Sequence, residues 1–81
     1  MEFQSLTLAD LKPGQRVRIR QIDTADRHAQ RLMVLGLVEH AELTFSGAAV
    51  GGDPLEFRLY GAAISLRRAQ AAAFSVEEVG S

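Results

Sequence analysis

The sequence predicts a mainly β fold with short helices. About five antiparallel strands form a small, partly open barrel, and a helix is inserted after the first strand. Several short segments alternate apolar and polar residues, as strands with one buried face do. Only the segment from Thr24 to Leu35 has the longer apolar period of a substantial amphipathic helix. The chain has 81 residues, so we expect one domain over residues 1–81, whose short strands must close on themselves or stack to bury their apolar faces.

The first expected element is a single helical turn over residues 5–11. Thr7 and Asp10 have the spacing of a shortened capping box, in which side chains satisfy backbone N–H groups at a helix start. A tight turn follows, because Pro13 fixes φ at the second turn position and Gly14 accepts a positive φ at the third. The chain therefore turns sharply before its first strand.

The clearest strand pattern runs from Gln15 to Asp23. Its apolar residues alternate with arginines, so the strand has one apolar face and one basic face. The arginines of the basic face are Arg16, Arg18 and Arg20. Ile22 breaks the alternation, and a bulge near Arg20 and Gln21 would return its side chain to the core.

The helix predicted from Thr24 to Leu35 begins with residues that suit a helix start. Asp23 or Thr24 can act as the N-cap. Asp26 adds a negative charge in the first turn, where the helix dipole favours it.

Gly36 marks the end of this helix. A glycine here can take the left-handed conformation that follows a C-cap, and Leu37 would then pack against Leu32 in a Schellman closure. We therefore expect Gly36 and the Leu32–Leu37 pair to shape the helix end.

The second half of the chain alternates strands and turns. Two alternating segments, 41–46 and 55–60, are joined by a loop in which Asp53 and Pro54 form a turn. The remaining expected elements are a strand over 62–66, about two helical turns over 67–73, a short strand over 74–76 and a tail from residue 77. This order of elements fits a small barrel of SH3-like type.

The composition argues against several classes of protein. The absence of cysteine removes a disulfide framework, a thiolate zinc site and a cysteine nucleophile. The net charge of −1 argues against a dedicated nucleic-acid binder, which usually carries a basic excess. No apolar run approaches the ~20 residues of a spanning helix, so we expect no direct membrane insertion. Met1 to Gln4 lack the features of a signal peptide, and we expect a cytoplasmic protein.

The sequence offers little for catalysis or metal binding. His28 and His40 are the only histidines, and they lack the spacing of a helical metal-ligand pair. A transition-metal site would need carboxylates from distant parts of the chain. We therefore expect no metal ligands and no cofactor. No nucleophile and base can be paired, so we do not expect an enzyme.

Three groups of residues, in order along the chain, resemble the FeoA family, the small cytosolic component of bacterial ferrous-iron uptake. The resemblance covers roughly residues 6–76 and rests on the order and spacing of the groups. The groups are Leu8-x-x-Leu11-x-Pro13-Gly14, then Arg31-Leu32-x-x-Leu35-Gly36-Leu37, then Gly52-Asp53-Pro54 with Gly61-x-x-Ile64-x-Leu66-Arg67-x-x-x-Ala71. One departure is Val38-Glu39-His40, where the family usually has a turn with proline and glycine.

The resemblance implies an SH3-like barrel that assists a large membrane transporter with a cytosolic GTP-hydrolysing domain (FeoB-like), without being an enzyme. It also implies the family's association with iron and with transition metal ion binding. A related barrel forms the C-terminal domain of metal-dependent repressors resembling the diphtheria toxin repressor. The alternative is therefore a freestanding SH3-like regulatory module that binds a peptide or itself.

The candidate partner surface lies at the end of the predicted helix. Its residues are Arg31, Leu32, Val34, Leu35 and Leu37. Ordinary helix packing and capping account for most of these side chains. However, Met33, Val34 and Leu35 are consecutive, so their side chains point in different directions from the helix. One small barrel cannot bury all of them. Some apolar surface should remain exposed, which often marks a contact site. The expected structural turns involve Gly14, Gly36, Asp53 and Pro54.

The arginine face of the first strand allows two interpretations. It can be a solvated face paired with Glu42 and Glu56 on neighbouring strands. It can also dock to an acidic partner or to phosphates. Exposed edge strands of a small barrel can pair between copies, so a weak homo-oligomer is also open.

Overall fold

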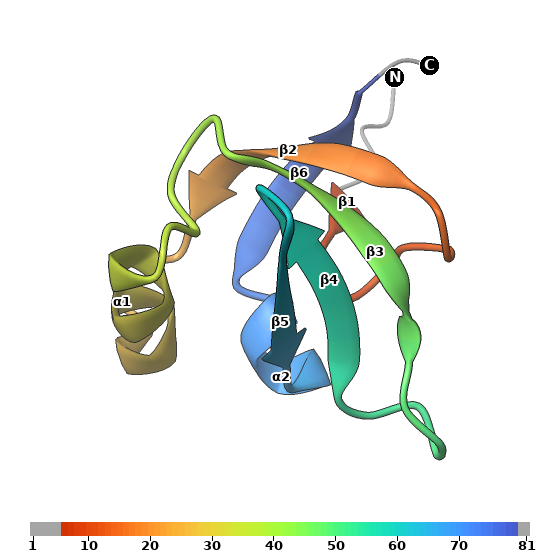
Figure 1. Cartoon of the computed structure of the whole chain (residues 1–81). Helices are drawn as coiled ribbons and strands as arrows, with labels where there is room; N and C mark the ends of the chain where they lie inside the picture. Colours follow the sequence, from red (N-terminus) through yellow and green to blue (C-terminus); the bar gives the residue numbers. More distant parts are fainter. Residues whose placement is uncertain (1–5, 80–81) are drawn as a thin grey trace, which may run out of the picture.

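The computed structural model describes residues 6–79, which form six strands in one antiparallel sheet and two short helices (Figure 1). The elements are β1 (Leu6–Thr7), β2 (Arg16–Ile22), α1 (Arg27–Val34), β3 (Glu42–Ala48), β4 (Leu55–Leu59), β5 (Ala62–Leu66), α2 (Arg68–Ala71) and β6 (Phe74–Glu78). The expectations for Met1 to Gln4, for the start of the first helical turn and for the last two residues lie outside the described residues.

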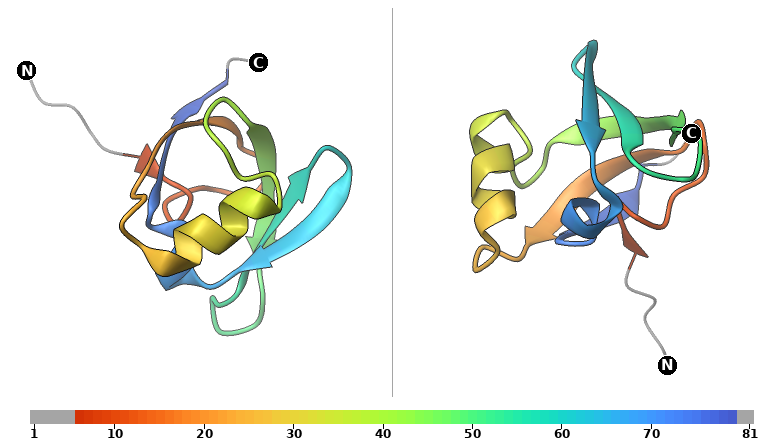
Figure 2. Two further views of the ribbon diagram at one scale, coloured as in Figure 1. Left: turned by 90° about the vertical axis from the view of Figure 1, so that its left-hand side faces the viewer. Right: turned by 90° about the horizontal axis from the view of Figure 1, so that it is seen from below.

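The strands lie in the order β1-β6-β2-β3-β4-β5, and every neighbouring pair is antiparallel. Over residues 6–79 the sheet curls without closing, and β1 and β5 form its two edges. Figure 2 shows α1 lying across one end of the curled sheet. The segment α2 carries the chain from the edge strand β5 back to β6 on the other side of the sheet.

The described residues contain six strands rather than the predicted five, because β1 pairs with β6 where only a helical turn was expected. The predicted capping contacts still form after β1. The Thr7 backbone N–H donates to Asp10 Oδ2 at 2.9 Å, and the Ala9 N–H donates to Thr7 Oγ1 at 3.1 Å. The chain therefore joins the sheet edge before it makes its single turn.

Because β1 precedes it, α1 follows the second strand rather than the first, and it begins at Arg27 rather than at the predicted Thr24. Asp26 is the N-cap, in an extended conformation, and its Oδ1 accepts the His28 N–H at 2.8 Å. Asp26 thus takes the capping role expected for Asp23 or Thr24. The preceding residues form a turn, in which the Asp26 N–H donates to the Asp23 carbonyl at 3.1 Å.

The core lies inside the curled sheet and takes apolar side chains from both helices and from five of the strands. The bulge predicted in β2 is present between Ile19 and Gln21, and it returns Ile22 to the core. The rings of Phe45 and Phe57 pack with centroids 5.3 Å apart. The buried apolar residues are Leu8, Val17, Ile19, Ile22, Ala29, Leu37, Ala41, Leu43, Phe45, Leu55, Phe57, Leu59, Leu66, Ala71, Phe74 and Val76.

The C-terminal elements differ from the predicted ones in length. A tail was expected from residue 77, but β6 continues to Glu78 because Glu77 and Glu78 pair with β2. Glu77 lies opposite Arg18 in this ladder. The segment α2 is one turn long, where about two turns were expected. Pairing with β2 thus extends the strand into residues that were expected to form a tail.

Candidate docking surface

One face of α1 packs on the core and the other faces solvent. Ala29 is buried, and Leu32 and Met33 are partly buried against the core. Arg27 and Arg31 are exposed and lie one helical turn apart. The helix is therefore held through a narrow apolar stripe, and its outer face is basic.

The C-terminal end of α1 has the predicted Schellman closure. Leu35 is the C-cap, and Gly36 follows it with φ at +111°. The Gly36 N–H donates to the Met33 carbonyl at 3.0 Å, and the Leu37 N–H donates to the Leu32 carbonyl at 3.2 Å. These two bonds define the motif. Leu37 is fully buried as a result.

The same closure leaves three apolar side chains on the outside. Val34 is 85% exposed, Leu35 is 64% exposed and Val38 is 40% exposed. We call these three residues the helix-end patch. Arg31 lies three residues before Val34 and therefore shares its side of the helix. The end of α1 thus presents apolar side chains beside a cation.

The β4–β5 hairpin lies next to this helix end. A Cβ atom placed on Gly36 would lie 3.3 Å from Leu59 Cδ2. Tyr60 follows Leu59 in the turn, is 79% exposed and has a positive φ of +51°. A large aromatic residue in this conformation is unusual. The surface near the helix end therefore includes an exposed aromatic side chain.

The predicted partner-binding residues fall into two groups. Arg31, Val34 and Leu35 are exposed at the end of α1. Leu32 is partly buried against the core, and Leu37 is fully buried. The last two side chains therefore shape the helix end and present little or no surface to a partner.

Two exposed residues near this surface were missed by the sequence reasoning. Val38 follows Leu37, which the closure buries, so the side chain of Val38 is directed outward. This exposure could have been inferred from the predicted closure. Tyr60 was counted as the last residue of a strand. The adjacent Gly61 was the available signal for a two-residue turn, which exposes both of its residues.

The predicted turn residues all take part in turns or loop contacts. Gly14 has φ at +90°, and the Gln15 N–H closes its turn on the Lys12 carbonyl at 3.0 Å. Asp53 Oδ1 accepts the Arg68 N–H at 2.9 Å, which fixes the loop before β4 to the start of α2. The Pro54 carbonyl accepts the Ala49 N–H at 2.9 Å. His40 has φ at +75° in the turn where the sequence departs from the family pattern.

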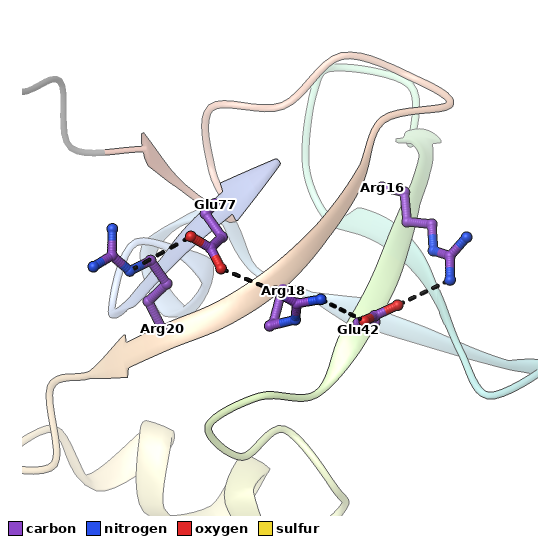
Figure 3. A network of polar contacts seen from close by, with 5 residues as sticks. All are labelled: Arg16, Arg18, Arg20, Glu42 and Glu77. Atoms are coloured by element: carbon purple, nitrogen blue, oxygen red, sulfur yellow. Dashed lines mark hydrogen bonds and ion pairs between the residues drawn. The ribbon is translucent and has the colours of Figure 1, made fainter. Parts of the chain in front are cut away.

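The arginine face of β2 forms a continuous chain of ion pairs (Figure 3). Glu42 of β3 lies between Arg16 and Arg18, with N–O distances of 2.9 and 3.0 Å. Glu77 of β6 lies between Arg18 and Arg20, at 3.1 and 3.8 Å. This network supports the interpretation of a paired, solvated face.

One of the predicted partners on this face was wrong. Glu56 does not pair with the β2 arginines, and its Oε2 accepts a hydrogen bond from Ser65 Oγ instead. Glu77 takes its place, because β6 rather than β4 is the second neighbour of β2. The sequence could not reveal this pairing, since residues 18 and 77 are far apart in the chain.

The network perturbs the protonation of Glu42. Hydrogen bonds from Arg18 and then Arg16 hold the pKa of Glu42 below its usual value. Hydrogen bonds to Glu42 and then Glu77 raise the pKa of Arg18. Because folding lowers the pKa of Glu42, its ionised form stabilises the folded chain at pH values above its ordinary, unfolded pKa. This contribution is lost as the pH falls through the lower, folded pKa.

We therefore expect the Glu42→Gln variant to lose less stability in acid than the wild-type chain. The free energy of unfolding, measured by urea titration between about pH 6 and about pH 3, should fall more steeply for the wild type. The difference in slope should shrink in high salt, which screens exposed charges. Equal slopes for both proteins would show that Glu42 contributes nothing to the pH dependence.

The described residues offer no obvious metal centre. Among residues 6–79, no three histidine or carboxylate side chains are close enough to hold a metal ion. Both histidines are exposed. None of the helices in the same residues has the length and apolar character needed to cross a membrane.

These features define a class of small, curled β-sheet proteins with a helix at one end and a solvated ionic face. The sequence pattern of the FeoA domain matches residues 6–78. No curated protein sequence matches the chain. The chain belongs to the FeoA family, which is associated with ferrous iron transport.

Two solved structures of FeoA proteins are similar to this chain over most of its length. The FeoA-like protein of Clostridium acetobutylicum is 26% identical, with a TM-score of 0.87, over 99% of this chain and 93% of that chain. The FeoA of Stenotrophomonas maltophilia, solved with zinc and described as a prokaryotic SH3 domain protein, is also 26% identical. Its TM-score is 0.78, over 90% of this chain and 91% of that chain. The bound zinc fits the family's association with transition metal ions.

A manganese-dependent transcriptional repressor has the same fold in one part of its chain. The TM-score is 0.84 at 16% identity, and the match covers 96% of this chain and 38% of the repressor. At this identity the likeness concerns the fold alone.

Proposed function

We propose that this chain is a cytosolic accessory protein of bacterial ferrous-iron uptake, with residues 1–81 acting as one domain. It acts by protein–protein contact on a membrane transporter that carries a GTP-hydrolysing domain (FeoB-like), and it has no catalysis of its own. Family membership supports the link to ferrous iron. The observation that carries the mode of action is the helix-end patch, a group of exposed apolar side chains on a rigidly closed helix end.

The helix-end patch has features of a docking site. Val34 and Leu35 are adjacent in sequence and more than half exposed, and contiguous exposed apolar surface on a small protein often marks an interaction site. The Schellman closure fixes their backbone, so little conformational freedom is lost there on binding. Arg31, beside the patch, suits a partner that places a carboxylate near an apolar contact.

Replacing Val34 and Leu35 together with serine tests this proposal. We expect the double variant to fold normally, because both side chains are exposed, and to lose co-purification with the transporter and support of iron uptake. Val50→Ser provides a control, since Val50 is a fully exposed valine in the loop between β3 and β4. Normal association and uptake with the double variant would remove this surface from the proposal.

The alternative is a freestanding SH3-like regulatory module that binds a peptide or itself. The fold shared with a metal-dependent repressor favours it. Recovery of a DNA-binding protein or a proline-rich peptide by the purified chain, with no transporter recovered, would support this alternative. The genes encoded next to this one offer a further check, because a neighbouring gene for a transporter with a GTP-hydrolysing domain supports the first function.

A further inference from the structure

The strand β5 leaves one side of its backbone free. It is the edge of the sheet and, within residues 6–79, pairs only with β4. Its sequence, Ala-Ala-Ile-Ser-Leu, contains no charge and no proline, which are the usual devices that prevent edge pairing. Ala62, Ala63 and Ser65 are exposed. Figure 2 shows the β4–β5 hairpin projecting from the body of the molecule.

The hairpin turn determines which backbone groups are free. Tyr60 and Gly61 both have positive φ, +51° and +85°, as in a two-residue type I′ turn. The residues that flank such a turn form a bonded pair, and bonded pairs then alternate along the ladder. With Leu59 opposite Ala62, the even-numbered residues of β5 bond to β4. Ala63 and Ser65 therefore direct their N–H and C=O groups to the open side.

We propose that a second copy of this chain pairs with the free edge of β5, antiparallel, with Ile64 facing Ile64 of the second copy. Ala63 of each copy then exchanges two hydrogen bonds with Ser65 of the other. The partly buried side chains of Ile64 extend the two cores toward each other. The pair is two-fold symmetric, which is the usual arrangement of a homodimer.

The charges on β4 favour a second copy in this register. Arg58 lies opposite Ala63, and Glu56 lies opposite Ser65. In the proposed register one row across the dimer runs Arg58, Ala63, then Ser65 and Glu56 of the second copy. The two-fold axis generates a second row with the same four residues, each taken from the opposite copy. Arg58 of each copy thus shares a row with Glu56 of the other copy, and the two side chains have opposite charges.

The neighbouring registers have the opposite electrostatics. If Ala63 faced Ala63 of the second copy, the two Arg58 side chains would share one row. If Ser65 faced Ser65, the two Glu56 side chains would do so. Like charges at the two ends of one row repel each other, most strongly at low salt. The charge pattern therefore selects the register centred on Ile64.

Glu56 reaches across to β5, and Arg58 reaches the turn that leads into β5. Arg58 Nη1 donates to the Gly61 carbonyl at 3.3 Å, and Glu56 Oε2 accepts from Ser65 Oγ at 3.1 Å. Strands are spaced by about 4.8 Å, and only the small side chains of Ala63 and Ser65 lie between Arg58 and the opposing Glu56. The backbones of Arg58 and the opposing Glu56 are three spacings apart, about 14 Å, and their long side chains bring the charges closer, to about one Debye length, roughly 10 Å at 0.1 M salt.

Charge exchange between copies gives the most specific test. Sedimentation equilibrium of the full chain at low salt should show a dimer that forms with increasing concentration. Arg58→Glu and Glu56→Arg should each weaken self-association by about tenfold or more, because each replaces two attractive rows with two repulsive ones. An equimolar mixture of the two variants should recover association, since the carboxylate introduced at position 58 of one variant then faces the guanidinium introduced at position 56 of the other. A mixture no better than either variant alone would overturn the proposal.

A backbone test separates this edge from the helix-end patch. Ala63→Pro removes an N–H that β4 does not use, so the fold should be kept while the dimer weakens by about tenfold or more. Val34→Ser should leave the dimer unchanged. A wild-type chain that stays monomeric at about 1 mM, or a dimer lost with Val34→Ser and kept with Ala63→Pro, would contradict pairing through β5. If Ala63→Pro fails to fold, the charge-exchange mixture still decides.

Discussion

Replacing Leu37 with alanine is expected to lower the free energy of unfolding by about 3 kcal/mol. The side chain is fully buried, and it is held there by the backbone closure at the end of α1. Truncation removes apolar contacts and leaves a cavity where the helix end meets the sheet. Chemical denaturation followed by far-ultraviolet circular dichroism measures the loss directly.

Leu35→Ala is the matched control for this prediction. The two leucines are separated by a single glycine, yet Leu35 is 64% exposed. Its truncation should change stability by less than about 0.5 kcal/mol, as surface substitutions usually do. Equal losses for the two variants would mean that the closure does not divide buried from exposed side chains.

Replacing Gly36 with alanine is expected to cost about 2 kcal/mol or more. Two effects add at this position. The φ of +111° is disfavoured for any residue with a Cβ atom, and that atom would also lie 3.3 Å from Leu59 Cδ2. Either the helix end or the side chain of Leu59 must then shift.

Gly14→Ala separates these two effects. Gly14 has φ at +90°, but a Cβ atom there would meet nothing within 4 Å. This control should therefore show only the backbone cost, about 1 kcal/mol. Denaturant titrations of both variants provide the comparison. A loss at Gly36 no greater than that at Gly14 would show that Leu59 yields without cost.

The parts of the fold that were predicted correctly have local causes. The alternation in β2 identifies its two faces, and the out-of-phase Ile22 indicates the bulge. The end of α1 follows from Gly36, because a glycine after a C-cap meets a conformational need that few other residues can meet. Each of these signals lies within a few residues of the feature that it predicts.

The parts that were missed depend on partners distant in sequence. Nothing near Leu6 indicates that it pairs with β6, and nothing near Glu77 indicates that it continues a strand beside β2. The start of α1 was misplaced for a different reason. Asp23, Thr24 and Asp26 are all good N-caps, so only packing decides among them. The turn residue after β4 was assigned to a strand because its exposure depends on the hairpin turn.

The candidate docking surface was only partly derivable from the sequence. The sequence indicated that an apolar helix end on a small barrel must expose something, and it placed Arg31, Val34 and Leu35 together. Geometry supplied what was missing, namely that Leu32 and Leu37 face the core and that Val38 does not. The helix end therefore has a structural side and an exposed side, separated by Gly36.

The arginine face of β2 has a structural role in the sheet. Three arginines are matched by Glu42 and Glu77, which come from the strands on both sides. The network ties three neighbouring strands together on the solvent side. It leaves the outer face of α1, with Arg27 and Arg31, as a separate basic surface near the helix-end patch.

The most direct test of the proposed docking surface is a binding titration against the purified transporter or its cytosolic domain. Removing Val34 and Leu35 together should weaken binding by about 100-fold, since each buried apolar side chain contributes roughly a tenfold change. Val50→Ser should bind within about twofold of the wild type. Thermal unfolding should confirm that all three proteins are folded. Unchanged affinity of the folded Val34→Ser/Leu35→Ser variant would contradict the account.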